Sequence, residues 1–213
     1  MGQNTENNPA ITLPFLGLDR LRMETDGEGV TTLVAAKGCP LSCRYCLNKE
    51  ILSGEVPVRA ITPEQLFRMV RIDDLYFRAT RGGVVFGGGE SLLHARFIRA
   101  FSAIVPGDWR ILAETCLNVP QELMQIALPA VDTWIVDIKD MNPEIYRAYT
   151  GQDNAQVIAN LKLLAEAGRC GDVTIRVPLI PSFNTEEDRR RSVEAVGKIG
   201  PFTKFDLFSY KVR

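Results

Sequence analysis

The sequence contains a single histidine, His94, and no long hydrophobic run. A transmembrane helix needs about 20 mainly apolar residues, and no window of this chain approaches that length. The first ten residues, MGQNTENNPA, lack the basic-then-apolar order of a secretory signal peptide. We therefore expect a cytoplasmic protein with no membrane partner, and we assign His94 no role.

The chain also lacks an excess of either charge, since 25 basic residues stand against 26 acidic ones. A strongly basic balance is typical of proteins that bind nucleic acid, so no nucleic-acid partner is expected. The chain has 213 residues, of which 46% are hydrophobic, and this is enough for one domain with a substantial core.

Cysteines are few, and their number, five, is odd. In a reducing compartment, clustered thiols indicate metal or redox chemistry rather than a disulfide framework. Three of them, Cys39, Cys43 and Cys46, lie in the stretch GCPLSCRYCLN. A structural zinc site is closed by four Cys or His ligands. The fourth would have to be Cys116, Cys170 or the sole histidine, each of which stands alone, so zinc stays open only as a minor alternative.

Apolar β-rich runs alternate with segments of helical period along the chain. This pattern predicts strands over residues 30–36, 84–87, 110–114, 132–137, 172–179 and 205–210. The capping sequence Thr62-Pro63-Glu64-Gln65 predicts a helix start, and Leu66, Met69, Val70, Tyr76 and Phe77 fall on one face of that helix. Six β-then-α units imply a parallel sheet with right-handed crossovers, curled into an open barrel or doubly wound.

The carboxyl ends of parallel strands meet on one face of such a fold. Several polar stretches follow the predicted strands directly, and we expect them to line one site. They are the cysteine stretch, Gly88-Gly89-Glu90, Glu114-Thr115, Asp137-Ile138-Lys139 and Ser209-Tyr210-Lys211.

The spacing CxxxCxxC, with Tyr45 before the last cysteine, resembles the signature of the radical S-adenosylmethionine (SAM) enzymes. Four-iron clusters normally take four thiolates. In that superfamily three cysteines hold a [4Fe-4S] cluster, and the amino and carboxylate groups of SAM bind the remaining iron. The resemblance implies that Cys39, Cys43 and Cys46 are the metal ligands. The 41 residues between Cys46 and Gly88 contain no cysteine, so one cluster is expected.

Other stretches are similar to the glycyl-radical enzyme activating enzymes, closest to the pyruvate formate-lyase activating enzyme type. They are DGEG at 26–29, Leu47-Asn48, DIKDMNPEIYRAYTG at 137–151 and IRVPLIP at 175–181. The resemblance implies a partial (β/α)6 TIM-type barrel in a single α/β domain. We expect this radical SAM core over residues 26–213, with residues 1–25 as an N-terminal segment that packs on it and whose first residues are mobile.

The same resemblance implies contacts to the methionine end of SAM. Gly88, Gly89 and Glu90 match the GGE element, in which a backbone carbonyl and the carboxylate receive the SAM ammonium. Glycines allow the backbone to approach a ligand closely, and an acid neutralises a cation. Lys139 matches a lysine that meets the SAM carboxylate, and Tyr45 belongs to the same cofactor site.

Five further residues are expected near the cofactor by resemblance alone. Asp137 and Thr115 match a cluster that holds a monovalent cation, and Glu114 stands where the family commonly has Asp. Arg176 matches a buried arginine of the fifth strand. Lys211 occupies the place of a histidine that contacts the ribose, which makes it the weakest of these matches.

The resemblance also implies an activity. A flavodoxin- or ferredoxin-type donor reduces the cluster, and SAM is cleaved to methionine and a 5′-deoxyadenosyl radical. Under anaerobic conditions that radical takes a hydrogen from a glycine Cα of a large glycyl-radical enzyme. No catalytic side chain is expected beyond the cofactors. Two alternatives stay open: a related radical SAM enzyme acting on a small molecule or short peptide, and a noncatalytic iron-sulfur or zinc protein.

Overall fold

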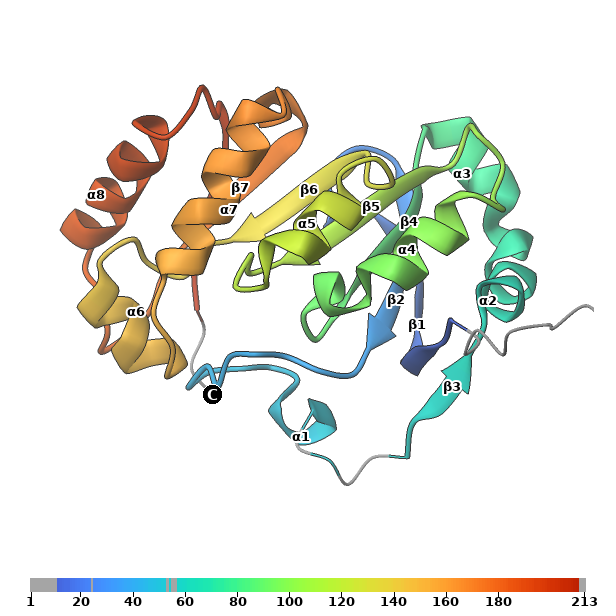
Figure 1. Cartoon of the computed structure of the whole chain (residues 1–213), viewed down its shortest axis with the longest axis horizontal. Coiled ribbons are helices and arrows are strands. Elements are labelled where there is room, and N and C mark those ends of the chain that lie inside the picture. Colours follow the sequence, from blue (N-terminus) through green and yellow to red (C-terminus); the bar gives the residue numbers. More distant parts are fainter. Residues whose placement is uncertain (1–10, 24, 53, 55–56, 211–213) are drawn as a thin grey trace, which may run out of the picture.

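Eight strands form one curved sheet in the order β3-β1-β2-β4-β5-β6-β7-β8 (Figure 1). The structure is a computed structural model that describes residues 11–23, 25–52, 54 and 57–210. Six strands run parallel: β2 Val30–Ala36, β4 Gly83–Gly88, β5 Arg110–Thr115, β6 Thr133–Asp137, β7 Val173–Leu179 and β8 Lys204–Ser209. Within the described part of the chain, the edge strands β3 and β8 do not pair, so the barrel is open.

The six predicted strands are all present, and no end differs from its predicted position by more than one residue. The expected single α/β domain with a partial (β/α)6 barrel is confirmed as an open, mostly parallel sheet. The prediction succeeds because a parallel strand buried on both faces appears in the sequence as a short, nearly continuous apolar run.

Two antiparallel strands, β1 Leu13–Met23 and β3 Arg59–Ile61, extend the sheet beyond β2. Neither was predicted. Pro14 and Gly17 weaken the strand signal of β1, and its pairing with β2 is interrupted by two register shifts. The domain boundary at residue 25 stays a prediction, as does the mobility of the first residues, which lie outside the described range.

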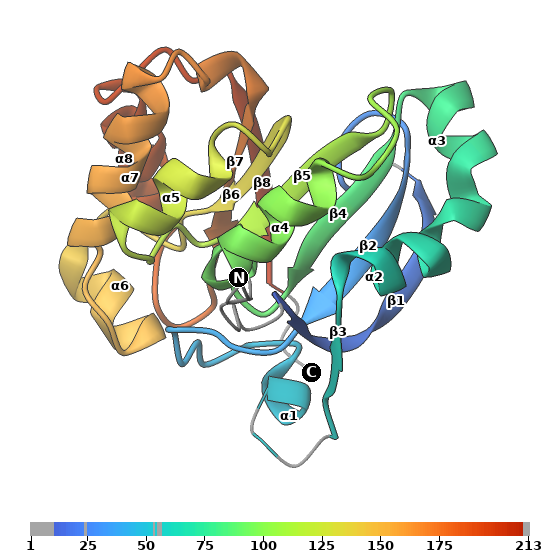
Figure 2. The ribbon, with the colours of Figure 1, turned by 45° about the vertical axis from the view of Figure 1, so that its right-hand side comes forward.

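Eight α-helices are described, and most of them cover the outer face of the sheet (Figures 1 and 2). They are α1 Lys49–Leu52, α2 Pro63–Val70, α3 Asp74–Thr80, α4 Ala95–Ser102, α5 Gln121–Ala127, α6 Pro143–Thr150, α7 Ala155–Glu166 and α8 Glu186–Gly197. The main core lies between these helices and the sheet, whereas Val85, Leu112 and Ile135 form a small apolar cluster on the concave side with Leu33. No helix in the described ranges is long and apolar enough to cross a membrane.

The helix predicted from Thr62 onwards is interrupted. Its capping box is present, but a 3-10 turn at Arg71–Asp73 separates α2 from α3. The Asp73 side chain is buried and accepts hydrogen bonds from Arg20 and Thr32, and these contacts hold the turn against the sheet. Of the residues expected on one face, Leu66, Val70 and Phe77 are buried, whereas Tyr76 is 48% exposed.

Candidate active site

The carboxyl ends of the parallel strands surround a cavity of about 450 Å³ together with the thiol loop, residues 38–48. Every predicted site residue among the described ones contributes to its lining. These are Cys39, Cys43, Tyr45, Cys46, Gly88, Gly89, Glu90, Glu114, Thr115, Asp137, Lys139 and Arg176. Lys211 lies outside the described residues, so its role stays a prediction.

Backbone hydrogen bonds fix the thiol loop against α6 and the β4 end. The amides of Ser42 and Arg44 donate to the carbonyls of Thr150 and Tyr149, at 2.8 and 3.1 Å. The side chain of Asn48 donates to the Gly88 carbonyl at 2.7 Å. A loop held at several points presents its side chains in a defined direction, which a multidentate metal site requires.

The three thiols of the loop are free and differ in their surroundings. Cys39 is exposed, whereas Cys43 and Cys46 are partly buried. The neighbouring thiol of Cys116 lowers the pKa of Cys39 to about 7, by a hydrogen bond that outweighs burial. Burial raises the pKa of Cys43 to about 11, although the nearby charge of Lys139 opposes this.

This donor set fits a cluster bound by three cysteines, because thiolates are the usual protein ligands of iron-sulfur clusters. The three side chains line one cavity, and the charge of Lys139 favours the deprotonated form of Cys39 and Cys43. In the part of the chain that the structure describes, no three Cys, His, Asp or Glu side chains are grouped as ligands of a single metal ion.

The glycines after β4 allow this strand end to lie directly against the thiol loop. The amides of Gly89 and Glu90 donate to the carbonyls of Ala36 and Gly38, at 3.0 and 2.7 Å. A Cβ atom on Gly89 would lie 2.1 Å from the Gly38 oxygen, and Gly88 has a φ of +88°. These glycines therefore have a structural role, whether or not the same backbone also contacts a ligand.

The carboxylate of Glu90 already accepts several hydrogen bonds from within the protein. Glu90 is only 2% exposed, and its carboxylate accepts hydrogen bonds from the amides of Leu92 and Cys116 and from the hydroxyl of Thr115. A carboxylate has about four acceptor positions, so these donors leave little capacity. Glu90 thus joins the β4 and β5 ends, and its contact with a SAM ammonium stays a prediction.

Lys139, Asp137 and Tyr210 form a polar group that also lines the cavity. The Lys139 ammonium donates to Asp137 Oδ2 at 2.5 Å and to the Tyr210 hydroxyl at 3.2 Å. Burial lowers the pKa of Lys139, but the charges of Asp137, Tyr210 and Cys43 together with the hydrogen bond to Asp137 outweigh it, and the pKa is raised well above its ordinary value. Asp137 Oδ1 is buried and has no hydrogen-bond partner among the described residues, so it is free to bind a ligand.

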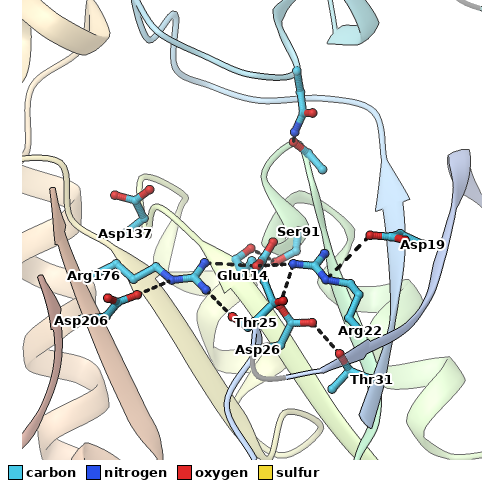
Figure 3. Close-up of polar contacts among 12 residues, drawn as sticks. Asp19, Arg22, Thr25, Asp26, Thr31, Ser91, Glu114, Asp137, Arg176 and Asp206 are labelled. Atoms are coloured by element: carbon cyan, nitrogen blue, oxygen red, sulfur yellow. Dashed lines mark hydrogen bonds and ion pairs between the residues drawn. The ribbon is translucent and has the colours of Figure 1, made fainter. Parts of the chain in front are cut away.

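An ion-pair network crosses the concave face of the sheet (Figure 3). The Arg176 guanidinium lies 3.2 Å from Glu114 and 3.3 Å from Asp206, and it donates to the Thr25 carbonyl at 2.7 Å. The last contact joins β7 to the turn between β1 and β2, 151 residues away in sequence. Burial raises the pKa of Glu114, with the Arg176 charge opposing it.

Arg22 continues this network on β1. It donates to Asp26 at 2.8 Å and lies 3.7 Å from Glu114, while Asp26 is buried and also accepts from Thr31. Sequence reasoning assigned Arg22 no role, and it noted Asp26 only as part of a motif. No local signal identifies Arg22, because its partners come from distant segments.

Tyr45 is part of an aromatic cluster beside the cavity. Its ring packs at 5.8 Å edge-on to Phe183 and at 6.1 Å from Tyr149, measured between centroids. Tyr149 in turn lies 6.1 Å from Tyr210. These contacts fix the ring just before Cys46 and explain an aromatic residue at this position without a direct cofactor contact.

The remaining cysteines and the histidine have separate places. Cys116 lines the active-site cavity, whereas Cys170 is buried in the outer core. His94 Nε2 lies 2.8 Å from the Lys37 carbonyl and so helps hold the chain just before the thiol loop. It was assigned no role from sequence, and this contact is structural.

An open α/β barrel with a three-thiol loop at the carboxyl ends of its strands defines an enzyme scaffold of the TIM type. Residues 33–195 match the family model of the radical SAM superfamily. The match covers well over half of the chain, which therefore belongs to the radical SAM superfamily and is an enzyme of that class. Membership implies a [4Fe-4S] cluster and SAM as cofactors.

Curated relatives agree with this family. The chain is 27% identical to the isethionate sulfite-lyase activating enzyme of Desulfovibrio desulfuricans, over 87% of this chain and 79% of the relative. It is 35% identical to the (2S)-3-sulfopropanediol dehydratase activating enzyme of Klebsiella oxytoca, over 76% and 69%. It is 29% identical to the pyruvate formate-lyase 2-activating enzyme of Escherichia coli, over 76% and 65%.

Among solved structures, the fold is similar to that of Streptococcus suis SuiB bound to S-adenosylmethionine. The TM-score is 0.64 at 14% sequence identity, over 82% of this chain and 39% of SuiB. At this identity the likeness concerns the fold alone.

Proposed function

We propose that this chain activates a glycyl-radical enzyme by taking a hydrogen from a glycine Cα of that partner. The three curated relatives described above are each named as an activating enzyme, and this observation carries the proposal. Superfamily membership also favours an enzyme over the noncatalytic alternative.

Bound cluster and SAM would supply one-electron cleavage of the SAM sulfonium, which yields methionine and the 5′-deoxyadenosyl radical. The protein's part is to bind and orient. Cys39, Cys43 and Cys46 would hold three irons, and Lys139 would receive the SAM carboxylate. The free oxygen of Asp137 supports a cation site beside it, with a monovalent cation as the proposed occupant.

The open side of the barrel supports a macromolecular target. The cavity extends from the thiol loop to Arg22, Glu114 and Arg176 on the concave face, and the edge strands β3 and β8 do not close over it in the described structure. A loop of the partner would enter as an extended peptide, so that its glycine reaches the reactive carbon. The flavodoxin- or ferredoxin-type donor, the cytoplasmic location and the anaerobic conditions stay predictions.

The deciding experiment is electron paramagnetic resonance on an anaerobic mixture of reconstituted enzyme, SAM, reductant and a candidate glycyl-radical enzyme. We expect a glycine-centred doublet that disappears when the partner glycine is replaced by alanine. Release of 5′-deoxyadenosine without any doublet, with partners from several glycyl-radical classes, would instead favour a small molecule or short peptide as substrate.

A further inference from the structure

A second hollow, of about 590 Å³, adjoins the thiol loop where the loop meets α1 and α6. It shares the three thiols with the active-site cavity, but its remaining lining comes from the loop itself and from these two helices. Figures 1 and 2 show the loop passing beside α6, with α1 next to it. The three thiols therefore separate two spaces, and only one of them is lined by the strand ends.

The second hollow is basic. Its lining includes Arg44, Lys49 and Arg147, all exposed. Among the described residues, these side chains form no ion pair, and no Asp or Glu lines the hollow. Glu144, on the same helix as Arg147, lines a different hollow. We call Arg44, Lys49 and Arg147 the basic rim.

This local charge stands out because the chain as a whole is nearly neutral. On α8, by contrast, arginines pair with a neighbouring carboxylate: Arg190 and Arg191 both contact Glu187. Three cations around a single hollow, with no ion pair to any described residue, create a positive potential that attracts an acidic partner.

We propose that the basic rim is the docking surface for an acidic one-electron carrier protein that reduces the cluster. The inference rests on the proposed function, in which the thiols hold the cluster and the strand-end cavity takes SAM and the target. The strand-end cavity is needed for SAM and the target, so an electron that enters beside α1 and α6 does not compete with them. One electron would pass from the reduced carrier to the bound cluster, with no bond formed or broken and no proton moved.

The size and composition of the surface suit a short-lived redox encounter. Such complexes have small interfaces and depend on charge for their association rate. The partly buried side chain of Leu52, at the end of α1, lines this hollow and offers an apolar contact beside the cations. This combination favours fast binding and release over a stable complex.

The test measures cluster reduction in the reconstituted enzyme, without any glycyl-radical partner. The probe is photoreduced flavodoxin, an acidic carrier, and the readout is the loss of cluster absorbance in a stopped-flow instrument. The variant is the triple charge reversal Arg44→Glu, Lys49→Glu, Arg147→Glu. We expect its reduction to be slower by about tenfold or more at low ionic strength, because steering contributes factors of 10 to 1,000. Added salt should slow the wild type towards the variant.

The matched control is Arg68→Glu, Arg99→Glu, Lys162→Glu, which makes the same change in net charge at exposed sites on α2, α4 and α7. Both triple variants should retain iron and sulfide and should be reduced by dithionite at the wild-type rate. If flavodoxin reduced the rim variant at the wild-type rate, the proposal would be overturned. Equal slowing of the rim variant and the control variant would overturn it as well. A rim variant that flavodoxin reduces normally, but that fails to form the glycyl radical in a separate assay with the partner enzyme, would assign the rim to the protein substrate instead.

Discussion

Arg176 on β7 and Glu114 on β5 form an ion pair across the concave face of the sheet, with Nη1 and Oε1 3.2 Å apart (Figure 3). Strand β6 lies between them, so the pair joins two strands that are not neighbours. Both residues were expected to serve a bound cofactor. Each has the other as a direct partner, so a ligand that recruits either one must compete with this pair, and their contact with a cofactor stays a prediction.

The first prediction concerns the pH dependence of stability at Glu114. Burial raises the pKa of this carboxyl above its ordinary 4.5, so the folded state holds the proton more tightly than the unfolded state. The contribution of Glu114 to stability is therefore largest below pH 4.5 and declines as pH rises through the raised pKa. As pH rises through this range, the free energy of unfolding of the wild type should fall relative to that of Glu114→Gln. The fall should be about 1.4 kcal/mol for each unit by which the pKa of Glu114 differs between the folded and unfolded states.

Urea unfolding of both proteins between about pH 4 and pH 8 measures this difference. Glu122→Gln, at an exposed position on α5, is the control and should stay within about 0.5 kcal/mol of the wild type throughout. If Glu114→Gln instead became less stable than the wild type as pH rose, the attraction of Arg176 would outweigh burial and our reasoning would be wrong.

Asp137 was predicted as a site residue and Arg22 was not, and the difference shows what a sequence can and cannot predict about this site. Asp137 was predicted because it ends a parallel strand, and all such ends meet at one edge. Arg22 lies on β1, an edge strand whose Pro14 and Gly17 obscure the pattern, and its role depends on Glu114 in a distant strand. Alternation identifies which side of a strand a residue faces, but not which remote charge it meets.

The helices also show that local features were predictable and long-range ones were not. The capping box at Thr62 was correctly predicted because it is local, with Thr62 and Gln65 satisfying each other's backbone amides. The break at Asp73 was not predicted, because it depends on Arg20 and Thr32, which are 53 and 41 residues away. Tertiary contacts of this kind override helical period.

The second prediction separates cluster ligands from other thiols. Cys43→Ala should abolish the four-iron cluster on anaerobic reconstitution, because it removes one of three proposed ligands. Cys170→Ala is the matched control, since Cys170 is buried in the outer core and does not line the active-site cavity. Iron and sulfide analysis measures both, and an intact cluster in Cys43→Ala would refute the ligand assignment.

The third prediction tests the contact between the β4 end and the thiol loop. Gly89→Ala places a methyl group 2.1 Å from the Gly38 oxygen, so the two segments must separate. We expect a loss of about 1–3 kcal/mol in stability, together with reduced cluster content, since the loop that carries the thiols is displaced. Gly107→Ala, whose Cβ meets nothing within 4 Å, should change neither.

The fourth prediction separates two properties of Lys139. Its backbone is left-handed, with a φ of 59°, which costs a residue other than glycine about 1–2 kcal/mol. Lys139→Gly should therefore be more stable to urea than Lys139→Ala by about 1 kcal/mol. Both variants lack the ammonium, so both should bind SAM about 10-fold to 100-fold more weakly, as expected for loss of one charge-assisted hydrogen bond.

Arg81 provides the matched control because it is exposed, has a φ of 57° at the end of α3 and does not line the active-site cavity. Arg81→Gly should exceed Arg81→Ala in stability by a similar amount, with SAM affinity unchanged in both. If the two Lys139 variants were equally stable, the left-handed backbone at this residue would carry no strain. If either variant bound SAM as tightly as the wild type, Lys139 would not contact the cofactor. Its ammonium would then serve only to neutralise Asp137.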